Sequence, residues 1–317
     1  MAETFDFLGL TGHLYGLCAA IAVGLLLLGM RLFKKLPHGT VRLFGVLAMV
    51  LGVIGARALY CVCNISRFTE TYENPWLMLR FFDGGLSMPG MLLGLMAAAA
   101  ITAHIQKISF AELMDAICLP LGLSIAVLRF GEQFTDLGVG KAVDEGFFTA
   151  NLPWLFQQSR MGVAIEYRLN VWAYEAVLGA AICLAVAWAY RRLKERSGDT
   201  ALLFFILYGA SQIMLESMRD DGHMMLIFLR VGQLAAALMP IIASAILLKR
   251  FNAQRKLGTW IGLILCAALI VVLEFSLDGR LTIGNPTLAR DYGVMFFVCA
   301  VMCALPCSLL LNRKAKA

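Results

Sequence analysis

The sequence predicts an all-α fold, a polytopic bundle of transmembrane helices that crosses a bilayer nine times. Two observations lead to this prediction. Of the 317 residues, 60% are hydrophobic and only 15% are charged, and the mean hydropathy is +0.78, whereas soluble domains are roughly 45–50% apolar and about 25% charged. The apolar residues are also gathered in long runs. Because so much apolar surface is stable only in lipid, we expect an integral membrane protein.

Each apolar run is long enough to cross a bilayer as a helix. A hydrocarbon core of about 30 Å requires about 20 helical residues. Only helices or closed barrels satisfy the backbone polar groups in lipid, and these runs are too long for barrel strands. The predicted helices are, roughly, residues 11–32, 41–63, 86–106, 112–131, 171–190, 200–218, 226–248, 258–276 and 292–311.

The basic residues predict the orientation of the bundle. Sixteen of the 27 lysines and arginines fall in alternate connections, which hold only four acidic residues. Because such residues stay on the cytoplasmic side, we expect the N-terminus outside and the C-terminus inside. The odd number of spans agrees with this orientation. The basic connections lie near residues 31–42, 107–115, 191–199, 249–256 and 313–316.

The longest predicted outer connection spans residues 132–170 and is rich in apolar and aromatic residues around 147–156. This pattern is typical of a segment that rests at the depth of the lipid headgroups. Packing of the same residues onto the helix ends is an equally good interpretation. The last two spans are almost free of polar residues and are expected to be an appendage to the working site.

Composition and spacing exclude several classes of site. Most of the nine cysteines lie in apolar runs, where cysteine behaves as a small hydrophobic residue. We expect no metal site, because no C-x-x-C pair has a matching partner. We expect no nucleic-acid partner, because no basic stripe with interleaved aromatic residues is present. Glu3 and Asp6 precede the first apolar run in place of a basic segment, which favours a true span over a cleaved signal peptide.

Ionisable residues inside spans are costly, so they indicate either function or pairing. Arg129 and Glu132 lie three residues apart, on one helical face. The planar guanidinium of Arg129 suits two phosphate oxygens. Glu132 could act as a general base or hold the arginine in place, and an ion pair that only stabilises helix packing is the alternative. Other such residues are Arg57, Glu175, Glu216 and Arg230.

A second polar group follows helical spacing. Tyr208, Gln212, Glu216 and Arg219 are separated by four, four and three residues and therefore share one stripe of a helix. Such a stripe is expected to face the bundle interior or an aqueous cavity. Interhelical hydrogen bonding is the alternative, but it contributes only about 0.6 kcal/mol per contact, too little to explain four polar residues.

A glycine-rich segment opens the third predicted helix. Gly84, Gly85 and Gly90 allow close approach of a backbone or a ligand. The free N–H groups at the start of the helix suit a phosphate, although a simple capping role for Asp83 or Ser87 is the better interpretation of the segment alone.

Two tyrosines lie at the outer starts of predicted helices. Tyr15 and Tyr174 are at the depth at which tyrosine usually anchors a helix in the interface. Tyr174 precedes Glu175, a carboxylate at membrane depth, so its environment differs from that of a simple anchor.

Over roughly residues 10–248, eight short motifs resemble the prolipoprotein diacylglyceryl transferases, in the same order and at plausible spacing. They are Tyr15-Gly16-Leu17; Gly55-Ala56-Arg57-Ala58-Leu59-Tyr60; Gly84-Gly85-Leu86-Ser87 with Gly90 and Gly94; Pro120-Leu121-Gly122; Arg129-Phe130-Gly131; Tyr174-Glu175-Ala176; Leu207-Tyr208-Gly209 with Glu216 and Arg219; and Gly232-Gln233.

The resemblance implies a seven-helix transferase-like core within residues 1–248 and two additional helices in 249–317. It also implies transfer of a diacylglyceryl group from phosphatidylglycerol, or a related anionic phospholipid, to the lipobox cysteine thiol of a preprolipoprotein signal peptide. Glycerol phosphate would leave and a thioether would form, with no cofactor. The location implied is the bacterial plasma membrane.

The resemblance also implies roles for individual residues. Arg129 and Arg219 would hold the lipid phosphate, and Tyr15 would donate a hydrogen bond to the headgroup. Glu132 or Glu216 would steer the headgroup or accept the thiol proton. The expected substrate-binding residues are Tyr208, Gln212, Arg219, Tyr174, Glu175, Arg57, Gly84, Gly85, Ser87 and Gly90.

Several positions depart from the family pattern. Pro89 stands where the family usually has histidine, Glu132 where it has asparagine, and Gln212 where it has a second functional arginine. Two interpretations therefore remain beside each other: a transferase with a modified site, and a related fold that binds or moves phospholipid without this chemistry. An unrelated membrane function, such as transport, is a third.

The predicted orientation is testable with a reporter enzyme that is active only outside the cytoplasm. Fused after Ala317, the reporter should be inactive, because the basic connections place the C-terminus inside. The same reporter inserted in the outer connection 132–170 should be active. Activity of the C-terminal fusion would overturn the orientation.

Overall fold

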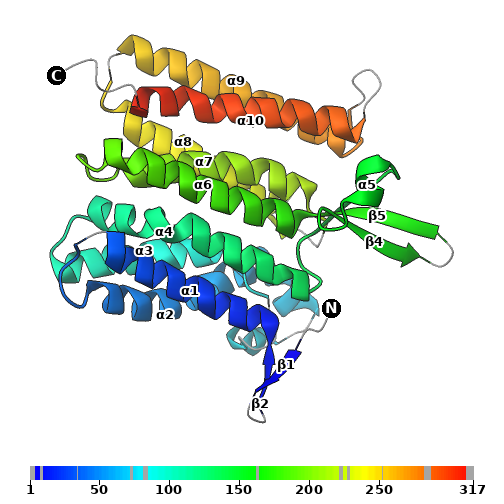
Figure 1. Cartoon of the computed structure of the whole chain (residues 1–317), viewed down its shortest axis with the longest axis horizontal. Helices are drawn as coiled ribbons and strands as arrows, with labels where there is room; N and C mark the ends of the chain where they lie inside the picture. The colour runs from blue at the N-terminus through cyan, green and yellow to red at the C-terminus, as the bar shows by residue number, and fades with distance from the viewer. Residues whose placement is uncertain are drawn as a thin grey trace.

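The protein is a bundle of long helices, as a computed structural model of the chain shows (Figure 1). The structure describes residues 4–7, 10–33, 35–71, 74–80, 85–161, 164–220, 224–226, 229–251, 253–281 and 287–311. In this part of the chain, nine helices are long and apolar enough to cross a membrane. They are α1 (Leu14–Phe33), α2 (Thr40–Cys63), α3 (Met88–Gln106), α4 (Phe110–Gly131), α6 (Val171–Leu193), α7 (Asp199–Met218), α8 (Val231–Leu248), α9 (Ala253–Leu277) and α10 (Leu288–Leu311).

The all-α, polytopic prediction is therefore confirmed, with small differences at the helix ends. The seventh span was expected to begin near residue 226 but begins at Val231, because β6 (Met225–Leu226) and β7 (Leu229–Arg230) form a hairpin before it. The ninth begins at Leu288 instead of residue 292. Leu226 and Leu229, before α8, are apolar but belong to strands, whereas the first turn of α10 contains the charged residues Arg290 and Asp291, so hydropathy alone locates neither start.

The irregular connections gather at one end of the bundle, which we call the loop-rich end (Figure 1). Within the described residues, every strand lies at this end. The strand β1 and the last turn of α10 lie at opposite ends, as an odd number of spans requires. The N-out orientation itself stays a prediction. The remaining elements are β1 (Thr4–Phe7), β2 (Leu10–His13), η1 (Arg67–Thr71), η2 (Pro75–Leu79), η4 (Glu132–Phe134), β3 (Val139–Val143), α5 (Phe147–Asn151), β4 (Phe156–Met161) and β5 (Ala164–Asn170).

The long connection 132–170 forms a small antiparallel sheet in the order β3-β5-β4, with α5 beside it. Its aromatic residues do not pack onto the helix ends. Phe147, Phe148 and Trp154 have 76%, 66% and 52% of their surface exposed. The interpretation that this segment packs onto the helix ends is thus wrong for these three residues. The other interpretation, contact with the lipid headgroups, stays a prediction.

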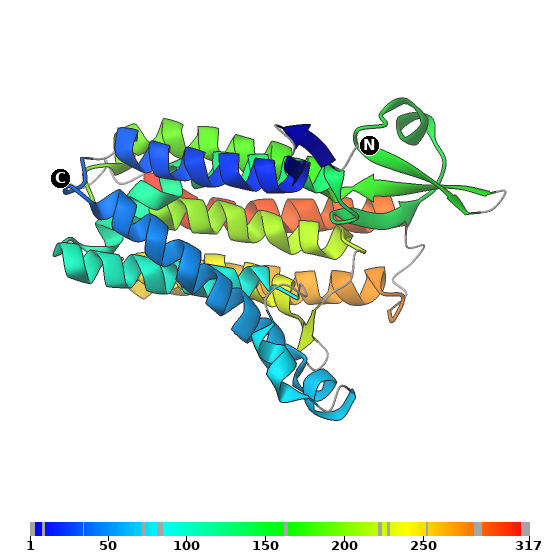
Figure 2. The ribbon, with the colours of Figure 1, turned by 90° about the horizontal axis from the view of Figure 1, so that it is seen from below.

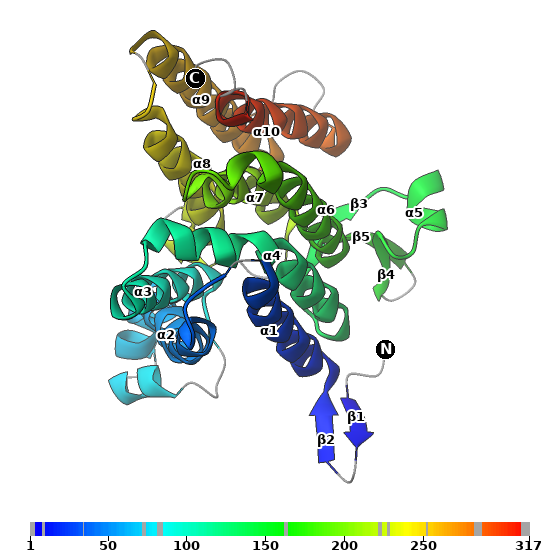
Figure 3. The same ribbon diagram turned by 60° about the vertical axis from the view of Figure 1, so that its left-hand side comes forward.

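The two helices that carry most of the polar candidates, α4 and α7, are also the most buried spans. Helix α4 packs against α1, α6 and α7, and α7 packs against α6, α8 and α10. Seen along the bundle, α2 and α3 lie at one edge and α9 and α10 at the other (Figure 3). Charged side chains on α4 and α7 therefore face protein, where partners are available, and not lipid.

At the end opposite the loops, α4 and α7 are joined by a buried carboxylate. Asp115, counted above among the acids of a connection, lies inside α4 with 3% of its surface exposed. It accepts hydrogen bonds from the backbone N–H groups of Gly198 (2.8 Å) and Ala201 (2.9 Å) at the start of α7. A carboxylate at a helix N-terminus compensates the free N–H groups and the helix dipole.

Helices α2 and α3 approach each other backbone to backbone, and α2 lies oblique to the rest of the bundle (Figure 2). A Cβ atom on Gly94 would overlap the carbonyl oxygen of Leu51, and one on Gly90 would overlap that of Gly55. Small residues permit such close packing in membranes. Gly90 was expected to bind substrate. The close packing of α2 and α3 explains why a glycine stands at this position.

We expect Gly94→Ala to destabilise the protein, because the atoms that its Cβ would meet are backbone atoms that cannot rotate away. Overpacking of this kind costs about 1–3 kcal/mol, more than the ~0.8–1 kcal/mol by which alanine favours helix. The matched control is Gly24→Ala on α1, where nothing lies within 4 Å of the added Cβ. Thermal unfolding in detergent should show a lower midpoint for Gly94→Ala only; equal midpoints would contradict the packing assignment.

Candidate active site

Four charged side chains meet at the loop-rich end of the bundle and form a closed ion cluster. Arg129 comes from the last turn of α4, Glu132 from η4, Glu175 from α6 and Arg219 from the C-cap of α7. Arg129 Nη1 lies 2.5 Å from Glu132 Oε1, and its Nε lies 3.1 Å from Glu175 Oε2. Arg219 Nη1 lies 2.9 Å from Glu175 Oε2, and its Nη2 lies 3.3 Å from Glu132 Oε2.

The cluster is buried and neutral. The four residues expose between 1% and 8% of their surface. Each carboxylate contacts both guanidinium groups, so two positive and two negative charges compensate one another. Removing ions from water costs several kcal/mol each, and only close pairing offsets that cost. The predicted pair of Arg129 and Glu132 is therefore confirmed, and it is half of a larger network.

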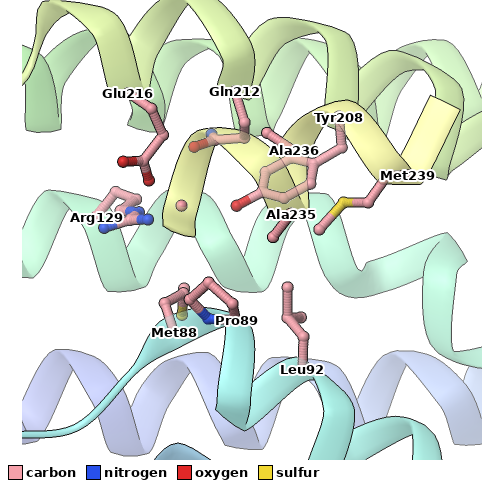
Figure 4. A pocket seen from close by; sticks show the side chains of 11 residues that line it. Met88, Pro89, Leu92, Arg129, Tyr208, Gln212, Glu216, Ala235, Ala236 and Met239 are labelled. Carbon is pink, nitrogen blue, oxygen red and sulfur yellow. The ribbon is translucent and has the colours of Figure 1, made fainter. Parts of the chain in front are cut away.

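A pocket lies directly beside the cluster. It is narrow, with a cavity volume of about 20 Å³. Figure 4 shows the carboxylate of Glu216 directed toward the guanidinium of Arg129, with Pro89 on the opposite wall. Helix α7 supplies a polar wall, and α3 and α8 supply apolar ones. The residues that line the pocket are Met88, Pro89, Leu92, Arg129, Tyr208, Gln212, Glu216, Gly232, Ala235, Ala236 and Met239.

The polar stripe on α7 is confirmed for three of its four members. Tyr208, Gln212 and Glu216 line the same pocket. The prediction that Arg219 shares their helical stripe is wrong, because α7 ends at Met218 and Arg219 has an extended backbone (φ −71, ψ 146). A bridge to Gly140 on β3 holds it in that conformation. The guanidinium of Arg219 consequently turns into the ion cluster.

Glu216 differs from the other two carboxylates at the site. Within the described residues, no hydrogen bond or ion pair of its side chain is found, although it lies in the pocket. Gly232 at the start of α8 makes room for it, since a Cβ there would lie 2.5 Å from Glu216 Oε2. Gly138, with φ +75, does the same for Glu132, whose Oε2 would lie 2.8 Å from an added Cβ. Sequence reasoning missed Gly138, since a loop glycine gives no local signal of a distant carboxylate.

Tyr15 lies in the first turn of α1, next to the C-terminal end of α4. A Cβ on Gly131 would lie 3.4 Å from its Cδ2 atom, and Gly131 immediately precedes Glu132. The ring is therefore beside the cluster. Tyr174, by contrast, packs in a small apolar cluster with Leu169 and Leu215, and it does not line the pocket.

Arg57 and the segment before α3 form a separate structure. Arg57 donates hydrogen bonds to the carbonyl oxygens of Leu77 (2.7 Å), Met78 (2.9 Å) and Gly85 (3.3 Å). Ser87 caps α3 by accepting a hydrogen bond from the N–H of Gly90 (3.2 Å). Arg57 thus orders η2 and the entry to α3, and capping is the role that the structure assigns to Ser87.

The two remaining glycine candidates lie in the same segment. Gly85 has φ +67 and packs against the ring of Tyr60, so a side chain at this position would be strained and would clash. Gly84, like Asp83, lies outside the described residues. In the part of the chain that the structure describes, no group of three or more histidine, cysteine or acidic residues is arranged to hold a metal ion.

Comparison with known proteins adds an independent finding. The sequence model of one protein family, described as prolipoprotein diacylglyceryl transferase, matches residues 3–249. Three relatives are each named phosphatidylglycerol–prolipoprotein diacylglyceryl transferase. That of Paenarthrobacter aurescens is 27% identical over 268 residues, 79% of this chain and 82% of the relative. That of Symbiobacterium thermophilum is 28% identical (74% and 86%), and that of Streptococcus equi subsp. zooepidemicus is 27% identical (76% and 92%).

We expect Glu175→Gln to destabilise the protein strongly, because two buried guanidinium groups would then share one carboxylate. Removing one partner of a buried ion pair costs about 3–5 kcal/mol. The control is Glu166→Gln, which removes a half-exposed partner of Arg168 and should cost at most about 1 kcal/mol. Unfolding midpoints in detergent distinguish the two; similar losses would show that the cluster does not hold the helix ends together.

Proposed function

Because the chain belongs to the prolipoprotein diacylglyceryl transferase family, we propose that it transfers the diacylglyceryl group of phosphatidylglycerol to a lipobox cysteine of a preprolipoprotein signal peptide. The reaction would take place at the outer leaflet of the bacterial plasma membrane. One observation carries the proposal: Arg129 lies at a pocket that combines apolar walls with the carboxylate of Glu216, for which no ion pair is found among the described residues. Such a pocket suits a lipid whose headgroup is a phosphodiester.

In the proposed reaction, the cysteine sulfur attacks the glyceryl carbon that is bonded to the phosphate oxygen. A carbon–sulfur bond forms, the carbon–oxygen bond breaks, and glycerol phosphate leaves with the bonding electrons. Negative charge grows on the leaving phosphate as the bond breaks. A guanidinium placed in advance at that position stabilises the transition state more than the ground state, and this is the role that we assign to Arg129.

The thiol must lose its proton, and the geometry favours Glu216 over Glu132 as the acceptor. Both oxygens of Glu132 contact guanidinium groups, one of Arg129 and one of Arg219, and a carboxylate so engaged is a weak base. Glu216 has no such contact among the described residues and lines the pocket itself. A general base must be within reach of the proton that it accepts, so Glu216 is the better placed of the two.

Lipid binding requires a change of partners at Arg129. Its guanidinium contacts Glu132 and Glu175, and a phosphate would compete with these carboxylates for the same N–H groups. At 4 Å and an effective dielectric constant of about 20, each such charge interaction is worth about 4 kcal/mol before desolvation. We propose that Arg219 then retains both carboxylates while Arg129 turns toward the lipid.

A second candidate function is lipid binding without transfer. The observation that favours it is Pro89, which lines the pocket where the family usually has histidine. Proline offers no proton donor or acceptor in its side chain. The transferase proposal therefore requires a carboxylate of α7 to perform the role of the absent histidine.

The test is a reconstituted assay with phosphatidylglycerol and a lipobox peptide, in which the product is a peptide heavier by one diacylglyceryl group. The unchanged protein should form this product. Arg129→Ala should lower kcat/KM by at least about 10²–10³, as removal of one transition-state donor does. Glu216→Gln should lower kcat by a similar factor, because it removes the proton acceptor and breaks no ion pair found in the described part of the chain.

Arg280→Ala, a change of an exposed arginine at the same end of the bundle, serves as the control and should retain full activity. If the folded, unchanged protein binds the lipid but forms no product, the lipid-binding candidate replaces the transferase. If Arg129→Ala is folded and remains active, the phosphate assignment is wrong.

A further inference from the structure

Helices α9 and α10 lie beyond the range that the family model matches, which ends at residue 249. They pack against α7 and α8 at one edge of the bundle (Figure 3). In the part of the chain that the structure describes, the pocket beside Arg129 is lined by α3, α4, α7 and α8 alone. Any effect of α9 and α10 on the proposed site must therefore pass through α7 or α8.

The position of the Glu216 carboxylate depends on α7 and α8. No hydrogen bond or ion pair of its side chain is found among the described residues, so no side chain there fixes it. Backbone confines it instead, since a Cβ on Gly232 would lie 2.5 Å from its Oε2 atom and 2.8 Å from its Oε1 atom. The carboxylate thus lies between the last turn of α7 and the first turn of α8, and a relative shift of these two turns would move it.

A hydrogen bond from α10 holds the last turn of α7. The hydroxyl of Tyr292 donates to the carbonyl oxygen of Ser217 at 2.9 Å, and Ser217 is the residue after Glu216. This carbonyl is among the last four of the helix, which have no partner within the helix itself. Both Tyr292 and Ser217 are buried, so the bond is closed off from water and lipid.

Two contacts from α9 and the turn after it hold the start of α8. Gln233, the residue after Gly232, donates from its Nε2 atom to Glu274 Oε1 at 2.7 Å. At the N-cap of α8, Arg230 Nη2 lies 3.1 Å from Asp278 Oδ1. The first turn of α8 is therefore tied to α9 on both sides of Gly232.

The packing around these contacts is apolar. Ala210 and Ile213 of α7 and Ala236 of α8 share one buried cluster with residues of α9 and α10, among them Leu263 and Met295. Because lipid is as apolar as these side chains, no hydrophobic force sets how the helices align, and interhelical hydrogen bonds contribute to that alignment. The directional contacts of Tyr292 and Glu274 are thus what fixes the height of α9 and α10 against α7 and α8.

We propose that Tyr292 and Glu274 are positioning residues, which hold the two turns so that the Glu216 carboxylate keeps its place beside Arg129. The inference rests on the proposed function, in which Glu216 accepts the thiol proton. Neither residue is among those that line the pocket, so each acts through the helix that it contacts. A reacting group misplaced by about 1 Å can lower a rate by on the order of 10², so a small movement of either turn is enough.

Four variants separate positioning from general stability. Tyr292→Phe removes the hydroxyl and keeps the ring that packs in the apolar cluster. Glu274→Leu removes the acceptor of the Gln233 bond, whereas Glu274→Gln removes the charge and retains an oxygen that can accept it. The matched control is Ser276→Ala, which breaks a buried 2.7 Å hydrogen bond to Asp291 between α9 and α10 themselves.

In the assay with phosphatidylglycerol and a lipobox peptide, Tyr292→Phe and Glu274→Leu should lower kcat by at least about tenfold. KM should stay unchanged, because Arg129 and the pocket walls are retained. Glu274→Gln and Ser276→Ala should retain kcat. The inference is overturned if Tyr292→Phe and Glu274→Leu, folded by their unfolding midpoints in detergent, keep full activity. It is also overturned if Ser276→Ala loses as much kcat as they do, because stability of the helix pair would then explain the loss.

A second measurement needs no product. Dicyclohexylcarbodiimide reacts with carboxyl groups in apolar surroundings, and mass spectrometry of the peptide that contains Glu216 gives the rate of labelling. Because the pocket has a volume of only about 20 Å³, the reagent reaches Glu216 when the two turns move apart. Labelling should be several-fold faster in Tyr292→Phe and Glu274→Leu than in the unchanged protein, Glu274→Gln and Ser276→Ala.

The two measurements distinguish failure of the inference from failure of the proposed function. If the folded, unchanged protein forms no product, the transferase proposal fails and the labelling rate decides the inference. Faster labelling of Tyr292→Phe and Glu274→Leu alone would then still show that these residues position the carboxylate. Equal labelling of Glu216 in all the variants and the unchanged protein would overturn the inference.

Discussion

Two guanidinium groups bridged by two carboxylates determine how the loop-rich end of this bundle is built. Inside a membrane protein an unpaired charge is not solvated by water. Arg129 and Arg219 therefore require acidic partners within contact distance. Those partners come from η4 and α6. The ends of three helices and the first turn of the long connection must therefore converge at one place. The pocket beside the cluster follows from this convergence, since α3 and α8 close the space that α4 and α7 leave open.

The same pairing shapes the chemistry of the proposed site. A neutral cluster does not attract an anionic lipid strongly from a distance, so recognition has to arise by exchange of partners inside the pocket. Glu132 provides the second anion, which makes the cluster neutral. Pro89 makes the pocket wall on α3 apolar, and the carboxylate that lines the pocket together with Arg129 is that of Glu216 on α7 (Figure 4). Phosphate binding is thus assigned to the guanidinium of Arg129, and proton transfer to the carboxylate of Glu216.

The sequence predicted correctly those features that depend on residues close together in the chain. The spans follow from hydropathy over about 20 residues, and the Arg129–Glu132 pair follows from i, i+3 spacing on one helix end. The misplaced residues depend on distant contacts. Arg219 does not continue the helical stripe of α7, because its backbone pairs with that of Gly140, a residue 79 positions earlier in the chain. Arg57 has the spacing of a site residue but binds three carbonyl oxygens of the segment before α3, and no periodicity in the sequence encodes that loop conformation.

The C-terminal helices α9 and α10 were expected to be an appendage to the working site. Their contacts nevertheless reach residues next to those that line the pocket. Tyr292 of α10 donates to the carbonyl oxygen of Ser217, the residue after Glu216. Glu274 of α9 accepts from Gln233, the residue after Gly232, and Gly232 is the glycine that leaves room for the Glu216 carboxylate. The two helices therefore hold both segments between which that carboxylate lies. Since a general base acts only over hydrogen-bond distances, the position of the proposed proton acceptor depends on a helix pair outside the matched family range.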